Sequence, residues 1–180
     1  MSGFTIINPG IQSTIQDGGR KGYGAIGVSE AGAMDEFAYH WNNKLLSNAF
    51  GTNVIEIAFG GLKLKATGTT HFAVTGAKVA VSINGCAVEN WKTHRIKDGE
   101  TLDIGFATSG QRIYVGVCGG FDVQPSFGSC ALSIKEGIGG IHGKVLQKED
   151  VLPFTCKELK ESRALCTKHQ PDYDGELTLR

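Results

Sequence analysis

The stretch NVIEIAFGGLKLKATGTTHFAVTGAKVAVSINGCAVENWKTHRIKDGETLDIGFATSGQRIYVGV, residues 53–117, predicts most of the fold. Apolar and polar residues alternate in it with a period of two, which is typical of strands with one buried face. Dipeptides that end in glycine, such as Asn84-Gly85 and Ser109-Gly110, separate the alternating segments. Glycine supplies the positive φ that tight hairpin turns need. Closely spaced short strands favour an antiparallel barrel or sandwich. The expected strands are residues 53–59, 62–66, 71–75, 79–83, 101–106 and 112–117.

A segment before this region has a helical pattern. In MDEFAYHWNNKLLS, residues 34–47, the apolar residues recur at helical spacing and so share one face. We expect one main amphipathic helix over about 34–47, with this face packed on the sheet and the polar residues between turned away. The apolar residues are Met34, Phe37, Ala38, Trp41 and Leu45, and the polar ones are His40, Asn42, Asn43 and Lys44.

The composition of the 180-residue chain excludes several classes of partner. Lys plus Arg is 18 and Asp plus Glu is 18, so there is no net field to attract nucleic acid or a membrane surface. The sequence has no run of about 18 apolar residues and no secretion-signal pattern at its start. Five cysteines without a CxxC pair indicate reduced thiols, and the histidine spacing predicts no metal site. We therefore expect a soluble, cytoplasmic protein with no nucleic-acid or membrane partner.

The most distinctive segment is the glycine-rich STIQDGGRKGYGAIGVSEAGAMD, residues 13–35, which leads into the expected helix. Asp17 and Arg20 lie three residues apart in it, where they can form a structural ion pair or face one anionic ligand. The letters GxGxxG occur at 22–27, but the helix begins too late for a dinucleotide-binding turn. The run GGIHGK, 139–144, is followed by valine and fails the phosphate-loop pattern.

This segment resembles the signature of the biotin-dependent carboxyltransferase-like family, which includes the C subunit of 5-oxoprolinase, allophanate hydrolase subunit 2 homologues and the carboxyltransferase part of urea carboxylase. The family pattern T-x-QD-x-GR-x-GY, followed by SGAMD and a helix, matches here with few changes, and the likeness continues to about residue 150. At four positions this sequence departs from the family pattern. Two of these residues, Cys130 and Lys144, stand where the family has arginine, which is a bidentate donor for carboxylate or phosphate. The departures are Ser29, Ala31, Cys130 and Lys144.

The resemblance implies a mainly β fold, a cyclophilin-like antiparallel β-barrel, over residues 1–152. Residues 153–180 would be a charged connector and a terminal strand, ELTLR, leading to a family second half that is absent here. The implied partners are a family homologue of the 5-oxoprolinase B subunit and a further hydrolase subunit.

The leading hypothesis is a subunit of an ATP-dependent 5-oxoprolinase-type complex, which converts 5-oxoproline to glutamate and acts only with its partners. No cofactor would be bound covalently, and ATP would enter through the complex. One alternative is the carboxyltransferase component of a urea carboxylase-like enzyme, the only reading that requires biotin. Another is a non-catalytic, partner-binding antagonist of a kinase inhibitor.

The resemblance also suggests which residues hold the small amide or carboxylate substrate. Asp17 would orient the substrate or act as a general base, and Arg20 and Arg112 would bind an anionic group. Asp35 would belong to the same catalytic group. The other expected substrate-binding residues are Gln16, Gly19, Gly22, Tyr23, Asn42, Ser129, His142 and Lys144.

Overall fold

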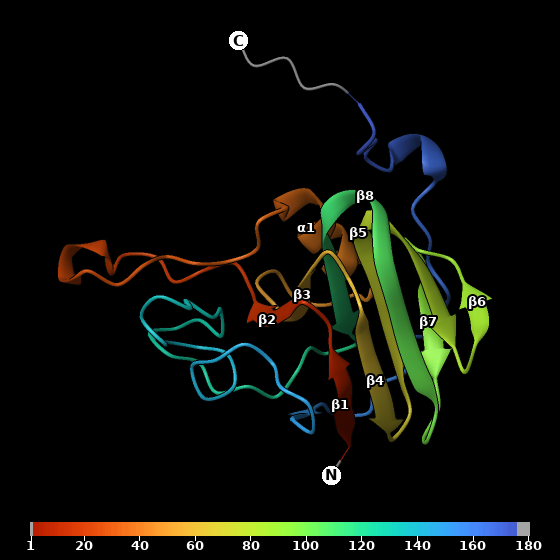
Figure 1. Ribbon diagram of the computed structural model, residues 1–180, viewed down its shortest axis with the longest axis horizontal. Coiled ribbons are helices and arrows are strands. Elements are labelled where there is room, and N and C mark those ends of the chain that lie inside the picture. Colours follow the sequence, from red (N-terminus) through yellow and green to blue (C-terminus); the bar gives the residue numbers. More distant parts are fainter. Residues whose placement is uncertain (1, 176–180) are drawn as a thin grey trace.

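The computed structural model describes residues 2–175, and these form a curled antiparallel sheet with one α-helix (Figure 1). The expected strand ELTLR, 176–180, lies outside the described residues. No helix in the described part of the chain has the length and apolar character needed to cross a membrane. The strands are β1 (Gly3–Pro9), β2 (Gln12–Gln16), β3 (Val54–Ala58), β4 (Leu62–Thr67), β5 (Thr70–Ile83), β6 (Cys86–Val88), β7 (Thr93–Ile96), β8 (Thr101–Val117) and β9 (Val151–Pro153). The helices are α1 (Glu36–Leu45) and two 3₁₀ turns, η1 (Gly24–Ile26) and η2 (Thr167–His169).

Two long strands, β5 and β8, cause the sheet to curl. They pair with each other over most of their length, while the end of β8 also pairs with β3 and its start with β4. One group of strands is β2, β3 and the end of β8, and the other is β1, β4 and the start of β8. Gly60-Gly61, which joins β3 to β4, connects the two groups. The sheet therefore folds back on itself as a half-barrel, which confirms the mainly β architecture.

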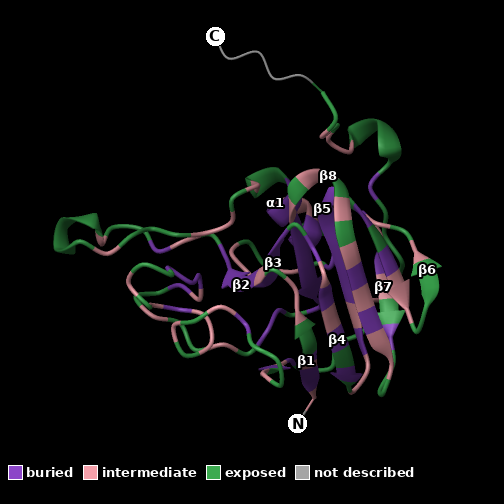
Figure 2. Cartoon of the chain, in the orientation of Figure 1, coloured by how far each residue is buried: buried purple, intermediate pink, exposed green. Residues whose placement is uncertain are grey.

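The alternating pattern of the sequence produces a single apolar interior between the two groups of strands. In β4, for example, Leu62, Leu64 and Ala66 are buried while the residues between them are not. Phe4 from β1 and Val115 from β8 lie in the same cluster. In Figure 2, buried residues alternate with more exposed ones along much of β8.

The sequence pattern missed some strands and divided others. The strands β1, β2, β6, β7 and β9 were not among those expected. Residues 71–75 and 79–83 belong to the single strand β5, and 101–106 and 112–117 belong to β8. Gly110 does have a positive φ of 77°, but Ser109 still pairs with Lys78 of β5. The glycine therefore produces an irregularity in a continuous strand, at which the strand bends, and not the expected hairpin turn.

The helix is confirmed, and the face predicted to be buried was partly wrong. Ala38 and Leu45 are buried as expected. Met34 is 70 % exposed and Phe37 is 46 % exposed, whereas Asn42 is fully buried. The side-chain nitrogen of Asn42 donates hydrogen bonds to the carbonyl oxygens of Ala73 and Tyr114, at 3.0 and 3.1 Å. The sheet below α1 thus offers polar acceptors, and they select a polar residue for the interface. The buried residues of α1 are Ala38, Tyr39, Asn42, Asn43 and Leu45.

Residues 121–150, which contain no strand of the main sheet, cover the free edge of β2. Leu132 donates its backbone N–H to Ile15 at 2.9 Å, and Leu146 donates to Ser13 at 2.8 Å. This segment holds the residues following β2 in place, and these residues form the candidate site.

The segment after β9 packs back on the sheet. Leu165 donates its backbone N–H to Trp91 at 2.8 Å, and Thr93 of β7 donates to Arg163 at 2.8 Å. The division expected at residue 152 falls inside β9 and stays a prediction.

His71 makes the packing of this segment sensitive to pH. The Nδ1 of His71 accepts a hydrogen bond from the backbone N–H of Leu159 at 3.2 Å. A protonated Nδ1 cannot accept, so protonation would break this hydrogen bond. Burial lowers the pKa of His71, Glu158 opposes this shift, and Arg95 adds to it. The unfolded chain therefore binds a proton more readily than the folded one, so stability falls as pH drops below about 6.5. We expect His71→Gln to flatten this part of the curve of unfolding free energy against pH, measured by urea denaturation. An unchanged slope between pH 7 and 5 would contradict this role.

Candidate functional site

A long arm, residues 18–34, leaves the sheet after β2 and returns at the start of α1 (Figure 1). The 3₁₀ turn η1 lies at its tip, and most of the arm is exposed (Figure 2). Backbone hydrogen bonds close its base, from Ala33 N–H to the Asp17 carbonyl at 3.1 Å and from Arg20 N–H to the Glu30 carbonyl at 2.8 Å. The two ends of the glycine-rich signature are thus held side by side.

Asp17 connects the base of the arm to residues far away in the sequence. Its carboxylate accepts hydrogen bonds from the backbone N–H of Gly19 at 2.9 Å, the hydroxyl of Ser129 at 2.6 Å and the backbone N–H of Cys130 at 2.6 Å. The residue is 7 % exposed. Both carboxylate oxygens are therefore engaged by the protein, and Asp17 positions the 126–131 segment against the arm. Its catalytic role stays a prediction.

Arg20 is buried next to Asp17, at 1 % exposure. Its guanidinium donates to the carbonyl oxygens of Ala131, Ser29 and Ser126. Arg20 forms no ion pair with Asp17, and three of its five N–H groups donate to these carbonyls. Arg20 thus ties the arm to the covering segment, and the catalytic role expected for it stays a prediction.

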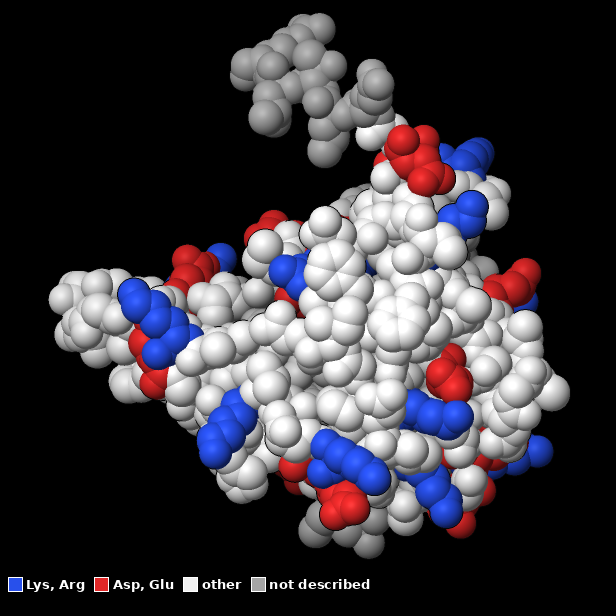
Figure 3. All heavy atoms as spheres, in the orientation of Figure 1, with Lys and Arg blue, Asp and Glu red and all other residues white. Residues whose placement is uncertain are grey.

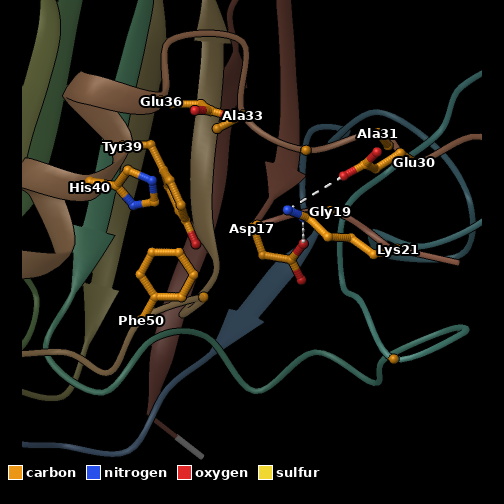
Figure 4. Close-up of a pocket in the computed structure, with 14 residues that line it drawn as sticks. Asp17, Gly19, Lys21, Glu30, Ala31, Ala33, Glu36, Tyr39, His40 and Phe50 are labelled. Atoms are coloured by element: carbon orange, nitrogen blue, oxygen red, sulfur yellow. Dashed lines mark hydrogen bonds and ion pairs between the residues drawn. The ribbon is translucent and has the colours of Figure 1, made fainter.

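Two clefts lie beside the part of the arm that returns to α1, and both are lined by Ala31 and Gly32. The first, the loop cleft, has a volume of about 400 Å³ and lies between the arm and α1 (Figure 4). The second, the strand cleft, has a volume of about 330 Å³ and lies over β2, β3 and β8. The loop cleft is also lined by Asp17, Gly18, Gly19, Lys21, Glu30, Ala33, Glu36, Tyr39, His40, Phe50, Gly51 and Gly128.

One wall of the loop cleft is aromatic. In Figure 4, Tyr39, His40 and Phe50 lie together opposite the arm, and the His40 and Phe50 rings stack with centroids 4.9 Å apart. The Tyr39 hydroxyl donates to the Thr52 carbonyl at 3.0 Å, and burial raises its pKa, with a further contribution from Asp17. Tyr39 therefore stays protonated near neutral pH.

The strand cleft is smaller than the loop cleft, and more of its lining is apolar. Glu56 from β3 and Arg112 from β8 face each other in it, with Arg112 Nε 3.9 Å from Glu56 Oε1. Gln16 holds together the part of the strand cleft formed by Gly32 and Leu132. The amide oxygen of Gln16 accepts the Gly32 N–H at 3.1 Å, and its amide nitrogen donates to the Leu132 carbonyl at 3.1 Å. Its other lining residues are Gln12, Thr14, Met34, Ala58, Ser133, Ile134 and Lys135.

A chain of hydrogen bonds runs from the strand cleft to the start of α1. Glu56 Oε2 accepts from the Tyr114 hydroxyl at 2.8 Å, and the same hydroxyl accepts the Asp35 backbone N–H at 2.7 Å. Asp35 caps α1 by accepting the Ala38 N–H at 3.0 Å and also accepts the Tyr173 hydroxyl at 2.5 Å. Asp35 therefore fixes the join between arm and helix, and its catalytic role stays a prediction.

The structure brings some of the expected site residues together and separates others. Gln16, Asp17, Gly19, Arg20 and Ser129 meet at the base of the arm. By contrast Asn42 lies between α1 and the sheet, and Arg112 lies in the strand cleft. Gly22 and Tyr23 lie on the outer arm, where the Tyr23 ring contacts Phe127, and His142 lines a separate hollow with Asp122. Lys144 follows on the same surface loop and belongs to neither cleft.

Several residues of the clefts were not in the expected set, among them Glu56 and His40. Glu56 matched the family pattern as a turn residue, yet its charge in the middle of an apolar strand was a signal for a buried polar site. His40 was assigned to the exposed face of the helix and offered no such signal. Within the described residues, no group of three His, Cys, Asp or Glu side chains is placed to hold a metal ion.

The fold and the clefts define a carboxyltransferase-type β domain, and comparison with known proteins agrees. The model of the family described as carboxyltransferase domain, subdomain A and B, matches residues 26–180, and the chain belongs to this family. It is 38 % identical to the C subunit of 5-oxoprolinase from Escherichia coli over 151 residues, which are 83 % of this chain and 48 % of that protein. The chain thus spans about half the length of this relative.

Similar sequences also occur within larger enzymes. Urea amidolyase of Saccharomyces cerevisiae is 36 % identical over 158 residues, which are 87 % of this chain and 9 % of that protein. The crystal structure of Kluyveromyces lactis urea carboxylase superposes with a TM-score of 0.82 at 32 % identity, over 84 % of this chain and 14 % of that one. In these relatives the matching region is part of a larger multi-domain or multi-subunit enzyme.

Proposed function

We propose that the chain is a subunit of an ATP-dependent 5-oxoprolinase-type complex and acts on a small amide substrate together with partner subunits. The observation that supports this proposal is the strand cleft, in which a guanidinium and a buried carboxylate face a space of about 330 Å³. This volume is at the lower end of the range for small-molecule sites. The likeness to the C subunit of 5-oxoprolinase suggests which small amide to test.

The loop cleft is poorly suited to ATP. The loop cleft has three carboxylates, Asp17, Glu30 and Glu36, and one lysine, Lys21, so it would repel a triphosphate. The glycine segment at 137–144 is equally unsuited, because several of its backbone N–H groups already donate to carbonyl oxygens within the same loop. We therefore place the nucleotide on a partner, either a homologue of the 5-oxoprolinase B subunit or a further hydrolase subunit.

The test is to purify the chain with its partner subunits and to assay glutamate release from L-5-oxoproline with and without ATP. We expect release only with ATP and only when this chain is included, because the strand cleft would supply part of the substrate site. Omitting the chain is the control. Release at the same rate without it would contradict the proposal.

Biotin-dependent carboxyl transfer is the second candidate, and the likeness to urea amidolyase favours it. Biotin on a partner domain would supply an activated carboxyl group, and Arg112 and Lys135 give the strand cleft the positive charge that suits such a donor. Transfer of labelled carboxylate to urea by the same set of subunits, without glutamate release, would favour this candidate over the first.

A further inference from the structure

The strand cleft presents a hydrogen-bond donor and an acceptor side by side. Glu56 is held in one orientation, because its Oε2 accepts both the Met34 N–H and the Tyr114 hydroxyl at 2.8 Å. Its other oxygen, Oε1, faces Arg112 Nε across 3.9 Å, which is longer than a hydrogen bond. Both groups thus keep capacity for a ligand.

The positive groups of this cleft outnumber the negative ones. Arg112, with 31 % of its side chain exposed, and Lys135 are both at the cleft, and Glu56 is the carboxylate opposite them. Guanidinium groups bind carboxylates with paired hydrogen bonds, so an anionic group would bind at Arg112. Thr14, whose hydroxyl oxygen accepts from Gln16 Nε2 at 3.2 Å, still has its own proton to donate.

We propose that the strand cleft binds an N-acylated α-amino acid or the corresponding lactam, with the α-carboxylate at Arg112 and the adjacent amide N–H at Glu56 Oε1. In such a molecule the N–H and the carboxylate are attached to the same carbon, so both can reach a donor and an acceptor 3.9 Å apart. L-5-Oxoproline has this pattern, whereas urea has no carboxylate. This inference rests on the proposed function and specifies which substrate groups the cleft recognises.

The direct test is calorimetric binding to the 180-residue chain. We expect L-5-oxoproline to bind and 2-pyrrolidinone, which lacks the carboxylate, to bind at least about tenfold more weakly. Arg112→Gln should weaken L-5-oxoproline by a similar factor and leave 2-pyrrolidinone unchanged. Arg95→Gln is the matched control, because Arg95 is on β7 and pairs with Glu158 at the surface. Equal affinity for the two ligands, or an effect of Arg95→Gln as large as that of Arg112→Gln, would overturn the inference.

A second variant keeps the inference testable if the chain with Arg112→Gln does not fold. Lys135→Gln changes an exposed side chain and should weaken L-5-oxoproline severalfold with no change in melting temperature. If the chain with Arg112→Gln is unfolded in circular dichroism, Lys135→Gln and the two-ligand comparison decide the question. No preference for L-5-oxoproline over 2-pyrrolidinone, together with no effect of Lys135→Gln, would contradict the inference.

The inference and the proposed function can fail separately. Binding that depends on Arg112, with no turnover by the assembled complex, would leave the inference standing and remove the proposed reaction. Turnover by the complex with KM for L-5-oxoproline unchanged by Arg112→Gln would support the proposed function and contradict the inference about Arg112.

Discussion

Arg20→Met should lower the free energy of unfolding by about 3–5 kcal/mol, because it removes the partner of three carbonyl oxygens in a buried place. This loss is a large fraction of the roughly 5–15 kcal/mol that stabilise an ordinary domain. The carbonyls of Ala131, Ser29 and Ser126 would be left without a donor. Urea denaturation at pH 7 measures the effect, and hydrogen exchange of the 126–131 segment should rise with it.

Lys21→Met is the matched control for this prediction. Lys21 is the next residue in the chain, carries the same charge and receives the same substituent, but 79 % of its side chain is exposed and its pairing with Glu30 spans 3.8 Å. Exposed ion pairs contribute between zero and about 1 kcal/mol, so Lys21→Met should have little effect. Equal stability of the two variants would show that Arg20 does not hold the arm to the covering segment.

The same comparison separates the two roles considered for Arg20. A positioning residue should lose stability and activity together, and Arg20→Lys should recover only part of both, since one ammonium cannot serve three separated carbonyls. A residue that binds substrate directly should instead raise KM with the unfolding free energy unchanged. The geometry supports the first pattern.

The sequence predicted the fold better than it predicted the site. Local patterns identified α1 and the strands β3, β4, β5 and β8, because alternation and capping act between near neighbours in the chain. They missed β1, β2, β6, β7 and β9. The contacts that position Arg20 come from Ser126 and Ala131, more than a hundred residues away, and no local pattern specifies them. The glycine-rich signature identified the right segment, but the roles of its charged residues depend on those distant partners.

The buried face of α1 shows a different limit. Hydrophobic periodicity placed Met34 and Phe37 inside, whereas the surface below the helix presents carbonyl oxygens that select Asn42. A Cβ at Gly116 would meet the Asn42 oxygen at 2.1 Å, so a glycine in β8 and an asparagine in α1 fit each other. Such complementarity between two elements is visible only after both are placed.

In Figure 3, charged groups gather on the lower part of this face of the molecule, and the area above them is mostly uncharged. Phe59 and Phe106 are 46 % and 63 % exposed near the Gly60-Gly61 crossing. Phe59 has a φ of 64°, a conformation that costs a bulky residue energy. The crossing is therefore built with strain, and it depends on the glycines beside it.

Gly60→Ala should be among the most damaging single changes in the sheet. Gly60 has a φ of 110°, and an added Cβ would lie 2.0 Å from the carbonyl oxygen of Gly105. The contact is with backbone, so no side chain can turn aside to relieve it. Adding about 1–3 kcal/mol for overpacking to about 1–2 kcal/mol for the left-handed conformation gives a loss of about 2–5 kcal/mol.

Gly99→Ala separates the two contributions. Gly99 has a φ of 81° and an added Cβ there would meet nothing within 4 Å, so this variant should lose only the conformational part, about 1–2 kcal/mol. The difference between the two melting curves then measures the close approach of β3–β4 to β8. If both variants lose the same stability, the crossing can widen to admit a methyl group, and the half-barrel is held by its strand pairing and not by that contact.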